Sequence, residues 1–295
     1  KMPAMVVGKN PAVRLVAWIM TIVLIFSLVT SQPTEAVADT IDVIASGECG
    51  TNAVWEITGN GTDTYKLTIK ATVEGASTNS YGTPTGKTAV PWVNYITKIT
   101  EFEVESGISY LGDRLCYGAT ALESITIPET VTGTGNGLFR GCTSLKTAVI
   151  PGAVTTMVDN LFYGCTLLEE VTLGEGTTVI GRNMVNGGCT SLKTLNIPGT
   201  IASFGETPFK GTSIQTINYS GTMGNYKLLV ETGNDSDVSP LKNAAITVNC
   251  TDGTWHYGDP IQIEGATSGN TGSLKWNYDK DNGILSFTGN GSMAD

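Results

Sequence analysis

The sequence predicts a β-rich solenoid of about six turns of ~23 residues, with one short parallel strand per turn and small β units on either side. Three observations lead to this fold class. An apolar triplet recurs at a fixed period through the middle of the chain, and a column of small residues recurs in the same register. The chain also contains 36 glycines and only 15 % charged residues among 295, as expected of a protein with many tight turns.

The charge balance and the single histidine exclude several classes of function. The chain has 17 basic and 27 acidic residues, for a formal net charge of −10. A nucleic-acid binder needs a basic surface that displaces counterions from phosphates, so we expect no nucleic-acid partner. One histidine excludes a His-rich metal site or an active site with several histidines. The composition therefore predicts a non-enzymatic protein with no cofactor.

The amino terminus has the pattern of an export signal. A basic segment precedes an apolar run over residues 15–29, and the small-x-small sequence Ala36-Val37-Ala38 follows it. The run is shorter than the ~20 residues that a membrane span needs. We expect cleavage after Ala38, a mature chain that begins at Asp39, and no membrane span after cleavage. A retained signal anchor is the alternative.

The repeat is an apolar triplet at positions i, i+3 and i+5. Its first residues are 22 to 24 positions apart, too regular a spacing to arise by chance. The six triplets are Ile99/Phe102/Val104, Leu122/Ile125/Ile127, Leu145/Ala148/Ile150, Leu168/Val171/Leu173, Leu192/Leu195/Ile197 and Ile214/Ile217/Tyr219.

This L-x-x-L-x-L pattern at a period of 20–29 residues is typical of a leucine-rich-repeat solenoid. The last two residues of each triplet alternate as in a strand, so they point inward while the residue between them faces solvent. Pro128, Pro151 and Pro198 are expected to end three of the strands, because proline has no N–H to donate.

A second column contains the sequences Gly141-Cys142-Thr143, Gly164-Cys165-Thr166 and Gly188-Cys189-Thr190. The cysteines could bind a metal or form disulfides. However, no C-x-x-C pair is present and their spacing is the repeat period, which is not a metal-ligand spacing. We therefore predict buried free thiols and no metal site. Whether Cys49 and Cys250 are paired stays open.

The repeat units resemble the BspA-like leucine-rich repeats of bacterial surface proteins. The resemblance rests on residues 144–151 (SLKTAVIP), 161–166 (LFYGCT) and 191–198 (SLKTLNIP). It implies a solenoid displayed at the cell surface that adheres to other proteins. Residues 217–250 resemble the closing segment of such arrays, and residues 46–57 resemble the small β unit that precedes them.

The N-terminal unit recurs at the C-terminus. Ser46-Gly47 and Trp55 align with Ser268-Gly269 and Trp276, and each copy has the pattern of a hairpin. The second copy stops early, so we expect a longer protein. The predicted domains are residues 1–38 (signal peptide), 39–92 (N-terminal small β unit), 93–221 (solenoid), 222–250 (C-terminal cap) and 251–295 (linker and truncated second copy).

Three groups of residues suggest chemistry, but each has a simpler structural interpretation. His256 is the one candidate histidine base, but the chain has no nucleophile motif and we expect an ordinary surface histidine. Residues 279–283 look like part of a calcium loop, yet their spacing fits a hairpin turn better. Glu101, Glu103 and Glu105 share one strand face, which we interpret as solvated. We therefore predict no catalytic residue.

The predicted binding face is the row of exposed residues between the last two members of each triplet. The row consists of Glu103, Thr126, Val149, Thr172, Asn196 and Asn218. We expect a secreted or cell-surface protein that binds a host extracellular protein or another cell-surface protein through this face.

Two alternatives remain. One is a glycan-binding or wall-associated module, which would show Trp92, Trp255 and Trp276 gathered on one surface. The other is the targeting region of a larger enzyme.

Overall fold

The structure is a computed structural model that describes residues 42–59, 64–233 and 238–259. It also gives the backbone of three further strands, β17 (Ser268–Thr271), β18 (Leu274–Asp279) and β19 (Ile284–Thr288). The predicted signal peptide, its cleavage site and residues 280–283 of the predicted turn lie outside the described residues. Within the described part, no helix is both long enough and apolar enough to cross a membrane.

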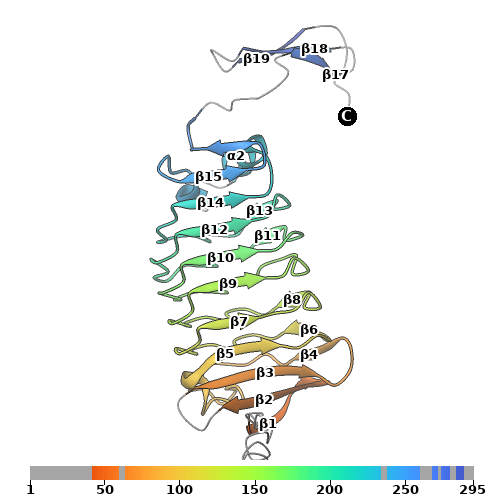
Figure 1. Cartoon of the computed structure of the whole chain (residues 1–295), viewed down its shortest axis with the longest axis vertical. Coiled ribbons are helices and arrows are strands. Elements are labelled where there is room, and N and C mark those ends of the chain that lie inside the picture. Colours follow the sequence, from red (N-terminus) through yellow and green to blue (C-terminus); the bar gives the residue numbers. More distant parts are fainter. Residues whose placement is uncertain are drawn as a thin grey trace, which may run out of the picture. The chain divides into compact units, whose positions relative to one another are not determined.

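Seven strands lie one above another in a single column, and Figure 1 labels them from β5 to β15. They are β5 (Ile99–Val104), β7 (Ser124–Thr126), β9 (Thr147–Ile150), β10 (Glu170–Leu173), β12 (Thr194–Ile197), β14 (Thr216–Tyr219) and β15 (Thr247–Cys250). Neighbouring strands pair in parallel except β7 and β9, where the column divides into two sheets. The predicted β-rich architecture with parallel strands is therefore confirmed.

The apolar triplets lie in register along this column. Phe102 pairs with Ile125, and Val171 lies between Ala148 and Leu195. All triplet residues are buried except Ile125 and Ile127, which are partly buried. Pro151 and Pro198 follow directly after the ends of β9 and β12, and Pro128 follows β7 after one intervening residue, as the sequence predicts.

A second column of short strands faces the first across the core. It contains β4 (Ala76–Thr78), β6 (Ile108–Leu111), β8 (Gly133–Thr134), β11 (Val179–Ile180) and β13 (Ser203–Phe204). Of these, β4–β6–β8 and β11–β13 pair in parallel. Phe139 and Phe162 stack between the columns, with ring centroids 5.6 Å apart and planes 8° from parallel. Aromatic side chains from successive turns thus fill the space between the columns.

The N-terminal strands close one end of this core. β1 (Asp42–Thr51), β2 (Ala53–Gly59) and β3 (Tyr65–Ala71) are antiparallel neighbours. β3 also pairs in parallel with β5, and β1 pairs with β4, so one eight-stranded sheet continues from the first column to the second. This sheet crosses the domain boundary predicted after residue 92. A short 3-10 helix, η1 (Ile96–Lys98), lies at the junction.

The other end is covered by α2 (Met223–Thr232), η2 (Ser239–Leu241) and the antiparallel strand β16 (Gly253–Trp255). The Thr222 side chain caps α2 by accepting a hydrogen bond from the Asn225 N–H at 3.2 Å. Tyr226 is buried and packs between Tyr219 and Trp255, at centroid distances of 5.4 and 5.9 Å. An aromatic cluster therefore covers the last turn.

The duplicated unit has the same strand order at both ends of the chain. In the first copy, Trp55 of β2 pairs with Gly47 and Ile69. In the second, Trp276 of β18 pairs with Gly269 and Phe287. Residues that align between the two copies of the sequence therefore have equivalent strand partners in two antiparallel three-stranded arrangements.

Deletion of residues 147–169 removes one period and joins Lys146 to Glu170, so each remaining strand keeps a partner in the same register. We expect cooperative unfolding to survive, with a lower melting temperature because one interface between turns is lost. Thermal denaturation followed by circular dichroism tests this. Deletion of residues 151–160 is the comparison, because it removes fewer residues but breaks the register. If the shorter deletion unfolds more cooperatively, the turns do not stack independently.

Candidate functional site

The predicted binding residues lie in one row on the exposed side of the first strand column. Parallel pairing aligns Glu103 with Thr126, and it aligns Thr172 with both Val149 and Asn196. Asn218 follows Asn196 in the same register. The structure thus brings all six residues to one face, and their role in binding stays a prediction.

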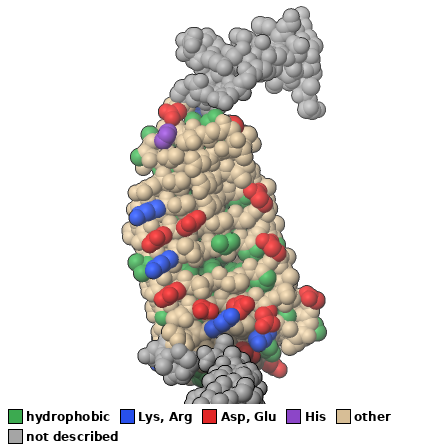
Figure 2. Space-filling model, in the orientation of Figure 1, with side chains coloured by type: hydrophobic (Ala, Val, Ile, Leu, Met, Phe, Trp, Pro, Cys, Tyr) green, Lys and Arg blue, Asp and Glu red, His purple; other side chains and the backbone are tan. Residues whose placement is uncertain are grey.

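Ion pairs compensate part of the acidic charge at the N-terminal end of the row. Lys66 on β3 pairs with Glu103, and Lys70 pairs with Glu56 and Glu105 at 3.1 and 3.7 Å. The hydrogen bond to Glu56 raises the pKa of Lys70. Figure 2 shows charged side chains gathered over this lower part of the face and few over β14 and β15. The acidic residues predicted to be solvated are therefore partly paired within the sheet.

The middle of the row is apolar. The Val149 side chain is 59 % exposed although it lies in the middle of a strand. Thr147 of the same strand and Thr172 of the paired strand β10 lie beside it, and the next strand of the column, β7, carries Ser124 and Thr126. Glu170 of β10 is opposite Thr147. The exposed valine therefore lies among side chains that are mostly short hydroxyls.

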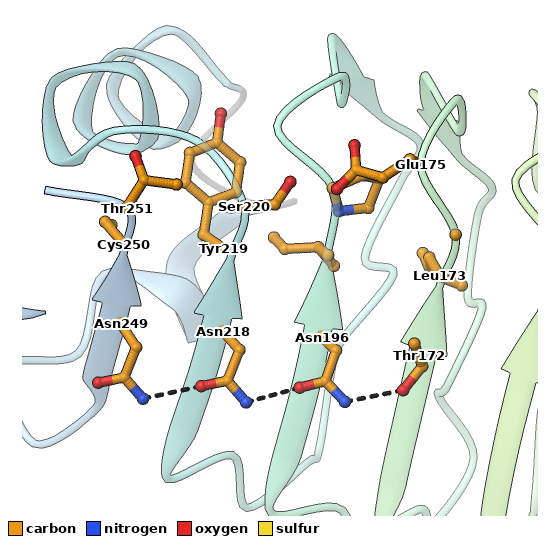
Figure 3. A pocket seen from close by; sticks show the side chains of 13 residues that line it. Thr172, Leu173, Glu175, Asn196, Asn218, Tyr219, Ser220, Asn249, Cys250 and Thr251 are labelled. Atoms are coloured by element: carbon orange, nitrogen blue, oxygen red, sulfur yellow. Dashed lines mark hydrogen bonds between the residues drawn. The ribbon is translucent and has the colours of Figure 1, made fainter.

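The C-terminal end of the row is a ladder of amide side chains. Asn196 Nδ2 donates to Thr172 Oγ1 at 2.7 Å, and also to Glu170 Oε1 at 2.6 Å. Asn218 Nδ2 donates to Asn196 Oδ1 at 2.6 Å, and Asn249 Nδ2 donates to Asn218 Oδ1 at 2.7 Å. The bonds run in one direction from strand to strand, as Figure 3 shows.

The sequence analysis did not include Asn249 in this row. The sequence does contain a signal for Asn249, because three segments share a Thr-x-Asn-x pattern. They are Thr194-Leu195-Asn196-Ile197, Thr216-Ile217-Asn218-Tyr219 and Thr247-Val248-Asn249-Cys250. The longer interval before the third copy, which holds α2 and η2, obscures the repeat. The predicted cap therefore supplies one more strand to the array.

The ladder borders an open groove of about 460 Å³. The groove, called the amide groove below, lies beside the carboxyl ends of β10, β12, β14 and β15. Figure 3 shows the amides along one side, with Glu175, Ser220 and Thr251 along the other. Leu173 and Cys250 lie between these two sides, and the Tyr219 ring extends to the side of Ser220 and Thr251.

The cysteine column is a hydrogen-bonded stack of buried thiols. Every cysteine is free, and Cys116, Cys142, Cys165 and Cys189 are fully buried. Each of the last three donates its thiol proton to a carbonyl of the preceding turn. The bonds are Cys142 Sγ to Cys116 O at 3.2 Å, Cys165 Sγ to Phe139 O at 3.1 Å and Cys189 Sγ to Phe162 O at 3.2 Å.

Burial raises the pKa of all four thiols in this column, so the thiols remain protonated donors at neutral pH. Burial also raises the pKa of Cys49 to about 12 and that of Cys250 to about 11. Gly141 and Gly164 precede two of these cysteines with φ of 75° and 79°, which glycine adopts without steric cost. The prediction of buried free thiols is confirmed, and Cys49 and Cys250 are not paired.

The remaining candidates contribute little to a site. His256 is partly exposed, and its Nδ1 lies 3.3 Å from Asp259 Oδ2. In the described part of the chain, no group of three or more His, Cys, Asp or Glu side chains could hold a metal ion. The expected tryptophan surface is wrong for two of its three members, because Trp92 and Trp255 are 0 % and 2 % exposed. The Trp276 side chain lies outside the described residues.

Comparison with known proteins identifies the repeat block. Residues 93–215 match the BspA type Leucine rich repeat region in six copies. The predicted resemblance is therefore confirmed for this block. No curated protein matches the chain significantly.

Solved structures of bacterial leucine-rich repeat proteins are similar to this chain. A leucine rich cell surface protein from Faecalibacterium prausnitzii A2-165 is 18 % identical with a TM-score of 0.41, over 81 % of this chain and 60 % of that protein. The chain thus spans less than two thirds of that protein's length. A leucine-rich repeat protein from Eubacterium ventriosum ATCC 27560 is 15 % identical with a TM-score of 0.33, over 60 % of this chain and 73 % of that one.

The buried thiols should react slowly in the native protein. Cys116, Cys142 and Cys165 are inaccessible and protonated, whereas reagents attack the exposed thiolate. We expect a thiol reagent such as dithionitrobenzoate to label none of these three until denaturant is added, when all should react. Mass spectrometry of the labelled peptides assigns each site. Fast native labelling of this column would contradict the burial.

Stability should fall at alkaline pH because the same thiols ionise more readily in the unfolded chain. Folding raises their pKa, so the stability is fully present below the unfolded value of about 8.5 and is lost as pH rises above it. Each thiol contributes a slope of about 1.4 kcal/mol per pH unit there. Urea unfolding over a pH series measures this slope. In Cys142→Ala the slope should be smaller by the contribution of one thiol. An unchanged slope would contradict the assignment of the pH dependence to these buried thiols.

Proposed function

We propose that this chain, which carries a BspA-type leucine-rich repeat region at residues 93–215, is a non-enzymatic secreted or cell-surface protein. In this proposal it mediates adhesion or protein–protein interaction with host matrix or neighbouring cells. Residues 1–38 direct export and are removed. The repeats form about six turns flanked by small β units, and they present the exposed row as the binding face.

The observation that carries the proposal is the surface around Val149. A side chain that is 59 % exposed in the middle of a strand leaves apolar area without a partner. Thr126, Thr147 and Thr172 provide a polar rim around it. Protein interfaces have this anatomy, in which a desolvated apolar centre is enclosed by polar groups that exclude water.

The charge arrangement favours recognition that tolerates salt. The acidic side chains near this surface already have partners within the sheet. Glu103 forms an ion pair with Lys66, and Glu170 accepts a hydrogen bond from Asn196. A cation of a binding partner would have to compete with these internal contacts. Binding through the apolar centre is therefore expected to change little with ionic strength, because screening acts mainly on exposed charges.

Substitution Val149→Lys should weaken adhesion, because it places an unpaired charge at the centre of the interface. We expect at least a ten-fold loss of affinity, as is typical for a central interface residue. Solid-phase binding of the full chain to a panel of immobilised host matrix proteins, at low and high salt, measures this. Saturable, salt-tolerant binding to one of these proteins is the expected result for the unsubstituted chain.

Val73→Lys is the matched control, since Val73 is 53 % exposed but lies outside the strand column. Its binding should equal that of the unsubstituted chain. Equal loss in both variants would mean that any added charge weakens binding, which contradicts a defined face. Failure to bind any of the matrix proteins would count against adhesion itself.

A further inference from the structure

We propose that the amide groove binds a neutral carbohydrate, in the form of an unbranched oligosaccharide that lies across β10, β12, β14 and β15. This goes beyond the proposed function, because the groove is a second site, which adjoins the surface around Val149 at Thr172. Its lining and its volume of about 460 Å³ are suited to a few sugar rings, since small-ligand sites begin at about 300 Å³.

The amides are held in a fixed orientation before any ligand arrives. Asn218 accepts from Asn249 and donates to Asn196, so its side chain has little rotational freedom left. Within the described residues, its amide nevertheless keeps one N–H and one carbonyl lone pair beyond the ladder. Asn249 likewise keeps one N–H. Neighbouring donors and acceptors fixed in this way can bond adjacent sugar hydroxyls at a low entropic cost.

The charge of the lining excludes anionic ligands. No lysine, arginine or histidine lines the groove, and Glu175 is its one acidic side chain. Burial keeps the Tyr219 phenol and the Cys250 thiol neutral by raising their pKa. A phosphate, sulfate or carboxylate would meet no cation and one like charge. Amides and the hydroxyls of Ser220 and Thr251 instead suit an uncharged ligand rich in hydroxyls.

Leu173, Ile197 and Tyr219 also border the groove. Their side chains belong to the core and are only 4 %, 3 % and 4 % exposed. The polar side chains therefore provide most of the surface that a ligand in the groove can contact.

Calorimetric titration of the full chain with neutral cello- and chito-oligosaccharides tests the proposal, with a heparin oligosaccharide as the anionic comparison. We expect saturable, salt-insensitive binding of at least one neutral series and none of heparin. Asn218→Ala should weaken binding about ten-fold, since it removes hydrogen bonds worth about 1 kcal/mol each. Asn225→Ala is the control, because Asn225 is an exposed amide on α2 that does not line the groove.

Thr251→Trp fills the groove without removing any member of the ladder, so it tests the site even where Asn218→Ala lowers stability. Binding that survives Thr251→Trp, or no binding of either neutral series, would overturn the proposal. Binding of heparin or of an extended peptide in preference to the sugars would do the same. Val149→Lys should leave sugar binding unchanged, which keeps a failure here distinct from a failure of adhesion.

Discussion

Hydrogen bonds between equivalent positions of successive turns hold the described structure together, and the fixed period of about 23 residues makes them possible. The parallel strand ladder is one set, and thiol-to-carbonyl bonds such as Cys165 Sγ to Phe139 O are a second. A third set lies at another corner, where the side chains of Asp113, Asn136 and Asp159 each accept from the backbone N–H of the next turn. Because each set joins residues of successive turns at the same interval, a change in period would break all three sets together.

A stack of this kind needs different solutions at its two ends, where the inward face would otherwise be open to water. At the N-terminal end, the sheet itself continues from the first strand column through β3, β2 and β1 into the second. Trp92 is buried there against Trp55, and its Nε1 donates to Leu115 O at 3.1 Å. At the C-terminal end, α2 and β16 place Tyr226 and Trp255 over the last turn. Trp55, Trp92 and Trp255 thus serve the core and are not available to a ligand.

Residues on the exposed face have the same regular spacing as the core residues, but their side-chain chemistry is not set by the core. Inward residues are restricted to apolar side chains that fit between the columns, whereas outward residues are free to differ from turn to turn. The row therefore changes from ion pairs at Glu103, through the apolar surface at Val149, to amides at Asn196 and Asn218. Such a scaffold can present separate binding surfaces on one sheet, because each strand contributes independently to the face.

The sequence by itself determined the repeat, the strand register, the inward triplets and the buried thiols, because each of these is a local pattern repeated at a constant interval. The outward row was also readable, since alternation along a strand assigns each residue to a face. Asn249, the ladder bonds, the Lys66–Glu103 pair and the amide groove depended on the tertiary structure. The interval before Asn249 is longer than one repeat, and Lys66 reaches Glu103 only because β3 pairs with β5. Contacts between segments that share no common period are decided by how the chain closes its ends, which no repeat pattern encodes.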